Sequence, residues 1–210
     1  MILLENVKGI RSIEKGETEK NIIKSLDDLG YKIYTGIINS HDFGVPQYRE
    51  RWYCVAFDKD CLFQFPIGNK AGKKVRDILE ENLNDDSLSI SEREKDLIDY
   101  HFSSNEKRVK HDWKYSQKNS KIGKHGMYSY LKPDNTLRFH VGDRAKSQIQ
   151  DFYYSSIDSV TAAMIVTRQP KLWDLKRYLS LKECQRLQGF PDSFKFDCVK
   201  DSIAKKALGN

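Results

Sequence analysis

The sequence predicts an α/β fold, because an apolar strand, an amphipathic helix and two further strands follow one another near the N-terminus. Residues 1–7 are mostly apolar and predict a buried strand. Residues 17–29 carry apolar side chains at helical spacing, and Gly30 is suited to end that helix. Residues 31–39 and 52–57 are rich in β-branched and aromatic side chains, which favour strands.

The rest of the chain predicts shorter elements, so we expect an α+β region after the α/β part. Residues 91–102 predict a helix, and residues 103–140 predict short strands joined by long loops. A strand is expected at residues 159–167, and a last helix is expected to start at residues 203–208.

Length and composition predict a soluble protein of one domain or two small ones. The chain has 210 residues, of which 39% are hydrophobic and 11% aromatic, enough for a modest core. No apolar run approaches membrane-spanning length, and Met1–Leu4 is followed at once by Glu5, so neither a membrane span nor a signal peptide is expected. The four cysteines form neither a C-x-x-C zinc pattern nor a dense disulfide framework. We expect reduced thiols, no metal site and a cytoplasmic location.

Positive charge is concentrated in residues 107–146. This stretch holds eleven Lys or Arg and three Asp, a net charge of +8, whereas the whole chain carries +6. Aromatic side chains are interleaved with the lysines at Trp113, Tyr115, Tyr128 and Tyr130. A solvated surface is the ordinary explanation of a charge run. Cations that displace phosphate counterions, with planar groups among them, instead favour a nucleic-acid surface, although they do not distinguish DNA from RNA.

The segment Arg177–Asp192 is the most specific one in the sequence. Ser180 and Glu183 form an S-x-x-E capping box at the start of a helix, and Gly189 followed by Pro191 ends it. An amphipathic helix packed on any core would show the same periodicity. The whole pattern, Arg-x-Leu-Ser-x-x-Glu-x-x-Arg-x-Gln-Gly-Phe-Pro, is more informative and resembles the ninth conserved motif of the DNA cytosine-5 methyltransferases.

Two further segments resemble conserved motifs of the same family, in the same order. Leu3–Val7 ends in Glu-Asn-Val, like the family's sixth motif. Asn39–Phe57 resembles the eighth motif, with its Gln-x-Arg-x-Arg core at Gln47, Arg49 and Arg51. The long stretch between the eighth and ninth motifs matches nothing, which agrees with the variable DNA-recognition region of the family.

The resemblance covers only the C-terminal part of such an enzyme. The cofactor-binding segment Asp-x-Phe-x-Gly-x-Gly-Gly is absent, and no Pro-Cys dipeptide occurs, so the nucleophilic Pro-Cys-Gln loop is absent too. Ala207–Asn210 resembles the start of the tenth motif, and Asn210 is the cofactor-binding candidate. We therefore expect either a piece of a longer chain or a separate subunit.

The resemblance implies that three side chains act on cytosine. Methylation at carbon 5 requires the base to be flipped out of the duplex and held by its edge. A carboxyl group facing N3 and the amino group stabilises the protonated ring, and a guanidinium facing O2 stabilises the charge that develops there. Glu5 and Arg51 are the candidates for these roles. Arg49 lies two residues from Arg51 and points the same way on an extended segment, so both can face the base pocket or the DNA backbone, and one of the two is a candidate for orienting Glu5.

Further side chains are candidates for contacts with DNA. Arg186 has two alternatives, a contact with phosphate or a structural bond to Glu183. The remaining candidates come from the two N-terminal motifs and from the basic stretch: Asn6, Gln47, Lys110, Lys114, Lys118, Lys121 and Lys124.

Together with the resemblance, the sequence predicts three regions. Residues 1–63 are expected to be the C-terminal part of a Rossmann-like methyltransferase sheet in the catalytic domain, and residues 64–200 a small, loop-rich α+β DNA-recognition domain. Residues 201–210 are expected to be the truncated start of a segment that returns to the catalytic domain. The implied reaction is methyl transfer from S-adenosylmethionine to carbon 5 of a flipped-out cytosine at a specific DNA site.

The implied partners are double-stranded DNA and an N-terminal part or partner subunit that carries the Pro-Cys loop. A cognate restriction endonuclease is a further candidate. The alternative function is that of a non-catalytic DNA-binding or specificity module derived from such an enzyme. Glu5, Arg49 and Arg51 argue against this alternative, since a mere reader has no use for a base-edge carboxylate.

Overall fold

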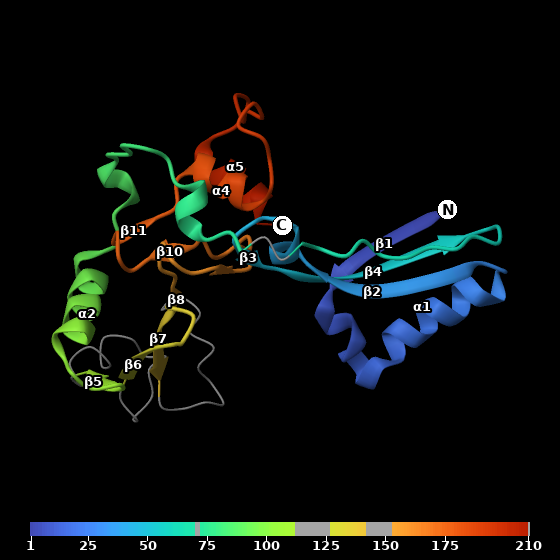
Figure 1. Ribbon diagram of the computed structural model, residues 1–210, viewed down its shortest axis with the longest axis horizontal. Helices are drawn as coiled ribbons and strands as arrows, with labels where there is room; N and C mark the ends of the chain where they lie inside the picture. The colour runs from blue at the N-terminus through green and yellow to red at the C-terminus, as the bar shows by residue number, and fades with distance from the viewer. Residues whose placement is uncertain (70–71, 112–126, 142–152, 210) are drawn as a thin grey trace. The chain divides into compact units, whose positions relative to one another are not determined.

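The computed structural model divides the chain into two compact units (Figure 1). The structure describes residues 1–69, 72–111, 127–141 and 153–209. The N-terminal unit consists of Met1–Gly44 and Tyr48–Gly72, and the C-terminal unit of Val45–Gln47 and Lys73–Asn210.

The N-terminal unit is built on a three-stranded sheet with the order β1-β4-β2. β1 (Ile2–Val7) and β2 (Lys32–Asn39) each pair antiparallel with β4 (Glu50–Phe57), so β1 and β2 run parallel to each other. α1 (Glu17–Asp28) lies between them in the chain, and the predicted helix and three strands are confirmed. Short 3-10 helices complete the unit: η1 (Lys8–Arg11), η2 (Ile13–Gly16) and η3 (Ser40–Phe43).

One face of this sheet forms the core of the N-terminal unit. Trp52, Cys54 and Ala56 of β4 are buried on this face, where they pack with Leu26 of α1. The prediction of a buried first strand is wrong, because β1 is an edge strand that turns only alternate side chains to the core. Leu3, on the other face, is 61% exposed.

The segment after β4 packs on the second face of the sheet. Phe63 meets Tyr34 edge to face, with ring centroids 5.5 Å apart. The ring of Phe65 lies 2.9 Å from the position that a Cβ at Gly36 would occupy, so only glycine leaves room for it there. The N-terminal unit therefore continues through Gly72, beyond the boundary expected at residue 63.

The C-terminal unit contains short elements joined by long connections. Its helices and strands are η4 (Val75–Ile78), η5 (Asp86–Leu88), α2 (Glu92–Ser103), β5 (Val109–His111), β6 (Met127–Leu131), β7 (Leu137–Val141), β8 (Tyr153–Tyr154), β9 (Thr161–Ala162), β10 (Lys171–Leu172), β11 (Arg177–Tyr178), α4 (Leu181–Leu187) and α5 (Asp201–Leu208). The strand predicted at residues 159–167 is wrong, because the chain reverses in a turn where the backbones of Ile165 and Arg168 bond to each other. In the described part of the chain, no helix is long and apolar enough to cross a membrane.

A four-stranded antiparallel sheet, β5-β6-β7-β8, packs against α2 (Figure 1). Leu97 and Ile98 of α2 are each 1% exposed. They belong to the same buried apolar cluster as Met127 and Leu137 of the sheet. The predicted helix at residues 91–102 is confirmed as α2, and its N-cap Ser91 forms a capping box with Glu94. The described part of the basic stretch lies in this sheet and in the residues that flank its strands.

A second core surrounds α4. Cys184 and Leu187 on this helix are fully buried with Leu172, Leu179 and Leu208, the last of these from α5. The predicted helix from the Ser-x-x-Glu box is confirmed, and α5 begins near the predicted position. Because α5 packs on α4, its described residues belong to the C-terminal unit.

Two buried histidines share one hydroxyl group between α2 and the sheet. The Oγ of Ser129 lies 2.7 Å from Nδ1 of His101 and 2.6 Å from Nε2 of His111. Burial lowers the pKa of both imidazoles, and the charge of His101 adds to this effect at His111, whose pKa falls to about 4. Both rings are therefore neutral in the folded protein at neutral pH.

This cluster predicts that acid destabilises the C-terminal unit. A histidine whose pKa is lower in the folded state stabilises the fold above its unfolded pKa, near 6.5, and this stability is lost as the pH falls toward the folded value of about 4. Within this window the free energy of unfolding should fall by up to about 1.4 kcal/mol per pH unit for each such group. Urea unfolding followed by circular dichroism measures it. His111→Asn should flatten the dependence, and an unchanged dependence would contradict the assignment.

Candidate active site

A pocket of about 330 Å³ opens on the face of the N-terminal sheet opposite α1. Its polar lining comes from all of the motif segments found in this unit. These side chains are Glu5, Ser40, Arg49, Arg51 and Tyr53. The pocket is large enough for a planar ligand the size of a base. Its lining is partly polar and charged, whereas the other face of the sheet forms an apolar core.

Strand alternation explains why these side chains meet. Glu5 lies directly opposite Tyr53 in the β1–β4 pairing, and Arg51 lies two residues before Tyr53 on β4. Side chains two residues apart on a strand point to the same face, so Glu5, Arg51 and Tyr53 share one surface. Trp52 and Cys54, at the intervening positions, turn to the core instead.

Glu5 and Arg51 form an ion pair across the two strands. Nε of Arg51 lies 2.9 Å from Oε1 of Glu5, and the Arg51 side chain is 15% exposed against 49% for Glu5. Nη1 of Arg51 also donates to the carbonyl oxygen of Glu50. The guanidinium is therefore held in place by two contacts, and the carboxylate it orients remains open to a ligand.

Arg49 completes the cationic side of the pocket. Its backbone N–H donates to Oδ1 of Asn39, which also accepts from the N–H of His41, so the residue before β4 is tied to the end of β2 and to η3. Burial lowers the pKa of Arg49 from its ordinary value, and the charge of Arg51 lowers it further, while Glu5 opposes both effects. The site thus brings together all three side chains predicted to act on cytosine.

Several pocket residues were missed by the sequence analysis. Tyr53 lies two positions after Arg51, so the alternation that pairs Arg49 with Arg51 could have identified it. Phe43, Ile38 and Pro66 form the apolar lining. Pro66 has no short-range signal, because only the packing of its segment on the sheet brings it to the pocket.

Asn6, which was predicted to contact DNA, lies on the other face of the sheet. Asn6 lies opposite Trp52, on the reverse side of β1 from Glu5, and its Oδ1 accepts from the N–H of Val7. Asn6 is therefore not part of the pocket, because a shift of one residue along a strand turns the side chain to the other face.

Gln47 is a structural residue of the C-terminal unit, not a DNA contact. It is fully buried at the start of β3 (Gln47–Tyr48). Its Nε2 donates to the carbonyl oxygen of Leu187 at 3.0 Å, and its Oε1 accepts from the N–H of Met164 at 2.9 Å. The neighbouring Pro46 carbonyl accepts from the N–H of Thr161. These bonds hold the eighth-motif residue against the end of α4.

Arg186 is also structural, and its predicted bond to Glu183 is wrong. Its Nε and Nη2 donate to the two carboxylate oxygens of Asp192 at 2.8 and 2.6 Å, and its Nη1 donates to the carbonyl oxygens of Ile78 and Leu79. The Arg186 contact lowers the pKa of Asp192 to about 2. Since every nitrogen is engaged within the unit, no phosphate contact is assigned to Arg186.

Glu183 pairs with Arg177 instead. The two guanidinium nitrogens lie 2.7 and 2.8 Å from its carboxylate oxygens, and the fully buried Glu183 also accepts from the N–H groups of Ser180 and Glu80. A buried carboxylate needs this full set of donors. The ninth-motif pattern therefore specifies an internal network rather than a ligand surface.

The predicted cationic contacts are only partly described. Lys110 lies exposed on β5 between the buried Val109 and His111. The remaining candidates from the basic stretch lie outside the described residues, as does the cofactor-binding candidate Asn210: Lys114, Lys118, Lys121 and Lys124.

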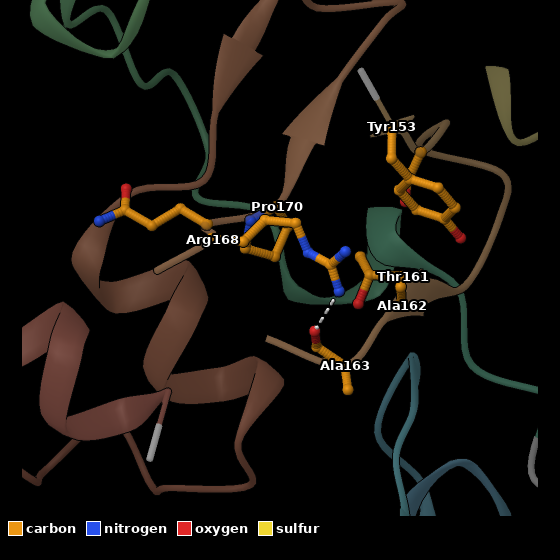
Figure 2. A pocket seen from close by; sticks show the side chains of 8 residues that line it. Tyr153, Thr161, Ala162, Ala163, Arg168 and Pro170 are labelled. Carbon is orange, nitrogen blue, oxygen red and sulfur yellow. Dashed lines mark hydrogen bonds between the residues drawn. The ribbon is translucent and has the colours of Figure 1, made fainter. Parts of the chain in front are cut away.

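A second, much smaller cavity of about 10 Å³ lies in the C-terminal unit (Figure 2). Arg168 reaches across it toward Thr161, and its Nη2 donates to the carbonyl oxygen of Ala163 at 3.2 Å. Such a volume holds about one water molecule. It is a packing feature rather than a ligand site.

Two of the four cysteines, Cys54 and Cys184, are buried. Burial raises the pKa of Cys184 to about 12 and also raises that of Cys54, so both remain thiols. Among the residues that the structure describes, no group of three or more His, Cys, Asp or Glu could hold a metal ion.

The comparison with known families agrees with this arrangement. The model of the C-5 cytosine-specific DNA methylases matches residues 1–210. The chain belongs to this family. Among its relatives, the Type II methyltransferase M1.ScrFI of Lactococcus lactis subsp. cremoris is 32% identical over 99% of this chain and 47% of the relative. M.FnuDI of Fusobacterium nucleatum is 30% identical over 99% of this chain and 59% of the relative.

This DNA methylase chain thus spans about half the length of the curated relatives that it matches. Two solved structures share its fold. The S. pombe Dnmt2 methyltransferase has a TM-score of 0.57 at 16% identity, over 99% of this chain and 60% of that one. The Entamoeba histolytica methyltransferase EhMeth has a TM-score of 0.52 at 20% identity, over 100% and 57%. The α/β methyltransferase fold is thereby established, whereas the Rossmann-like character of the complete sheet remains a prediction.

The environment of Gln47 predicts a stability defect in Gln47→Ala. The change removes the hydrogen bonds that Gln47 makes to the buried N–H of Met164 and the carbonyl of Leu187, and it should lower the free energy of unfolding by about 2–3 kcal/mol. Chemical denaturation measures it. The control is Gln64→Ala at an exposed position, expected within about 0.5 kcal/mol of the parent. Equal stability of the two variants would contradict the structural role.

Proposed function

We propose that this DNA methylase chain supplies the base-edge residues and the DNA-recognition region of a DNA (cytosine-5)-methyltransferase. The observation that carries the proposal is the ion pair between Glu5 and Arg51, with Arg49 and Tyr53 beside it in one pocket. A carboxylate and two guanidiniums converging on a base-sized cavity match the polar edge of a cytosine. The family match over the whole chain supports the same assignment.

Each charged group has a distinct chemical role in this proposal. Carbon 5 becomes nucleophilic only after a thiolate has added to carbon 6 of the ring, which draws negative charge onto N3 and O2. Glu5, open on its ligand side, hydrogen-bonds N3 and the amino group and stabilises the protonated ring. Arg51 is already held by the protein, so it presents donors to O2 without reorganising during the reaction.

The methyl donor in this proposal is S-adenosylmethionine. It supplies the methyl group when bound, and the residue expected to contact it, Asn210, lies outside the described residues. The proposal therefore assigns no described side chain to the cofactor, and the roles of Glu5 and Arg51 concern the base alone.

The nucleophile in this proposal comes from an N-terminal part or partner subunit with a Pro-Cys loop. The sequence has no Pro-Cys dipeptide, and the buried Cys54 and Cys184 remain thiols. β1 offers an edge for that part, because its outer edge pairs with no strand in the described part of the chain, and its own residues Leu3 and Val7 are 61% and 50% exposed. A cognate endonuclease and a cytoplasmic location are further elements of the proposal.

The first test of this proposal is complementation. The chain alone should transfer no labelled methyl group to double-stranded DNA, because it has no accessible Pro-Cys nucleophile. Addition of an N-terminal part bearing the Pro-Cys loop should restore transfer. Methyl transfer by the 210 residues alone would contradict the division of labour.

The second test separates chemistry from binding in the complemented enzyme. Glu5→Gln and Arg51→Ala should each slow single-turnover methyl transfer by about two to four powers of ten, the usual cost of losing one acid–base or charge-stabilising group. DNA affinity should change far less, because phosphate contacts carry most of it. Single-turnover rates and dissociation constants are the measurements.

Matched controls exist on the same unit. Glu50→Gln removes an exposed carboxylate of β4 that pairs with Lys8, and Arg11→Ala removes an exposed guanidinium that pairs with Glu19. Neither lines the pocket, so both should react at the parental rate. If Glu5→Gln also reacted at the parental rate while DNA binding persisted, a non-catalytic DNA-binding module would be the better description.

A further inference from the structure

The four-stranded sheet of the C-terminal unit has a second face that carries cations and tyrosines. The pairing places Lys110 opposite Tyr128, and Tyr128 opposite His140. In the next row Tyr130 lies opposite Arg138, and Arg138 opposite Tyr153. We call these residues, with Arg108 just before β5, the open face.

Alternation separates the open face from the core. Val109, Met127, Leu137 and Tyr154 occupy the intervening strand positions and are at most 2% exposed. Met127, Leu137 and Tyr154 belong to the apolar cluster that packs with α2, and Val109 is buried as well. The side chains of the open face therefore point away from α2, and Arg108, Lys110 and Arg138 are exposed.

The guanidinium groups of the open face are held by aromatic rings. The guanidinium carbon of Arg108 lies 4.6 Å from the ring centroid of Tyr128, and that of Arg138 lies 5.4 Å from the ring centroid of Tyr153. The π face of a ring attracts a guanidinium placed over it and leaves the N–H groups available to an acceptor. The side-chain entropy that a ligand must otherwise overcome is thereby reduced.

The described residues of the open face carry no compensating negative charge. No described residue of β5, β6, β7 or β8 is acidic. Arg108, Lys110 and Arg138 form no ion pair with a carboxylate of the described chain, whereas nearby Lys171 is paired with Glu94 at 2.6 Å. Cations left unpaired together on a flat surface favour an extended polyanion as the ligand.

We propose that the open face binds the sugar–phosphate backbone of double-stranded DNA, through Arg108, Lys110 and Arg138. Across the sheet, β5 and β7 are separated by two strand spacings, about 10 Å, so the cations span several phosphates of a duplex, whose strands carry one charge per about 3.4 Å. Contacts to phosphate position the duplex and carry no sequence information of their own. The inference rests on the proposed function and adds the surface that holds the DNA.

The experiment measures binding of a fluorescein-labelled DNA duplex to the 210-residue chain by anisotropy over a range of salt concentrations. Lys110→Ala and Arg138→Ala should each weaken binding and reduce the slope of log affinity against log salt by about one unit. Arg138→Lys keeps the charge and should keep the slope. The matched control is Lys95→Ala on α2, which removes one positive charge on the helix that covers the opposite face.

The outcomes separate the surface from the function. Reduced slopes for Lys110→Ala and Arg138→Ala, with a parental slope for Lys95→Ala, support the open face. Binding by the parent with unchanged slopes in all variants overturns the open face and leaves the proposed function intact. No binding by the parent, alone or complemented, overturns the proposed function as well. Preferential binding of single-stranded RNA or of phosphatidylserine vesicles, lost in the same variants, would assign the face to another ligand.

Discussion

The alternation of side chains along β4 is the constraint on which the N-terminal unit depends. As the central strand, β4 pairs on both edges, so its register fixes β1 and β2 together. Trp52 turns to the core and is 1% exposed, and this anchors the opposite phase, in which Arg51 and Tyr53 face the pocket. A slip of one residue would put two apolar side chains in the pocket and a guanidinium in the core. Burying that charge without a partner would destabilise the folded state. The chemistry of the site is therefore protected by the packing of the core.

The C-terminal unit depends on a different device, the buried polar network. Gln47 and Glu183 are both fully buried, and each is satisfied by several backbone groups. Such networks are costly when a member is missing and specific when complete. A unit of short elements and long connections has few extended ladders to define its backbone. The eighth- and ninth-motif side chains supply that definition by bonding to carbonyl and N–H groups far away in the sequence.

The sequence predicted what depends on neighbouring residues. The helices over α1, α2 and α4 have caps and periodicities within a few residues, and all three are found. The meeting of Glu5 with Arg51 was predicted from the motif resemblance, and strand alternation explains it. The exposure of β1, the burial of Gln47 and the pairing of Arg186 with Asp192 were not predicted, because each depends on long-range packing. From the sequence alone, a polar side chain in a conserved motif is interpreted as a ligand contact. Only the structure shows whether its partners lie inside the protein.

Charge is used in opposite ways in different places of this chain. At the pocket, one carboxylate faces two guanidiniums, so the carboxylate offsets only one of the two cations inside the site. On the open face, cations are stacked on rings and left without carboxylates, which attracts a polyanion at long range. Within the C-terminal unit, by contrast, Arg177 and Arg186 form ion pairs with Glu183 and Asp192 of the same unit. A count of basic residues therefore overstates the surface available to DNA, and the partner of each cation decides whether it binds a ligand or the fold.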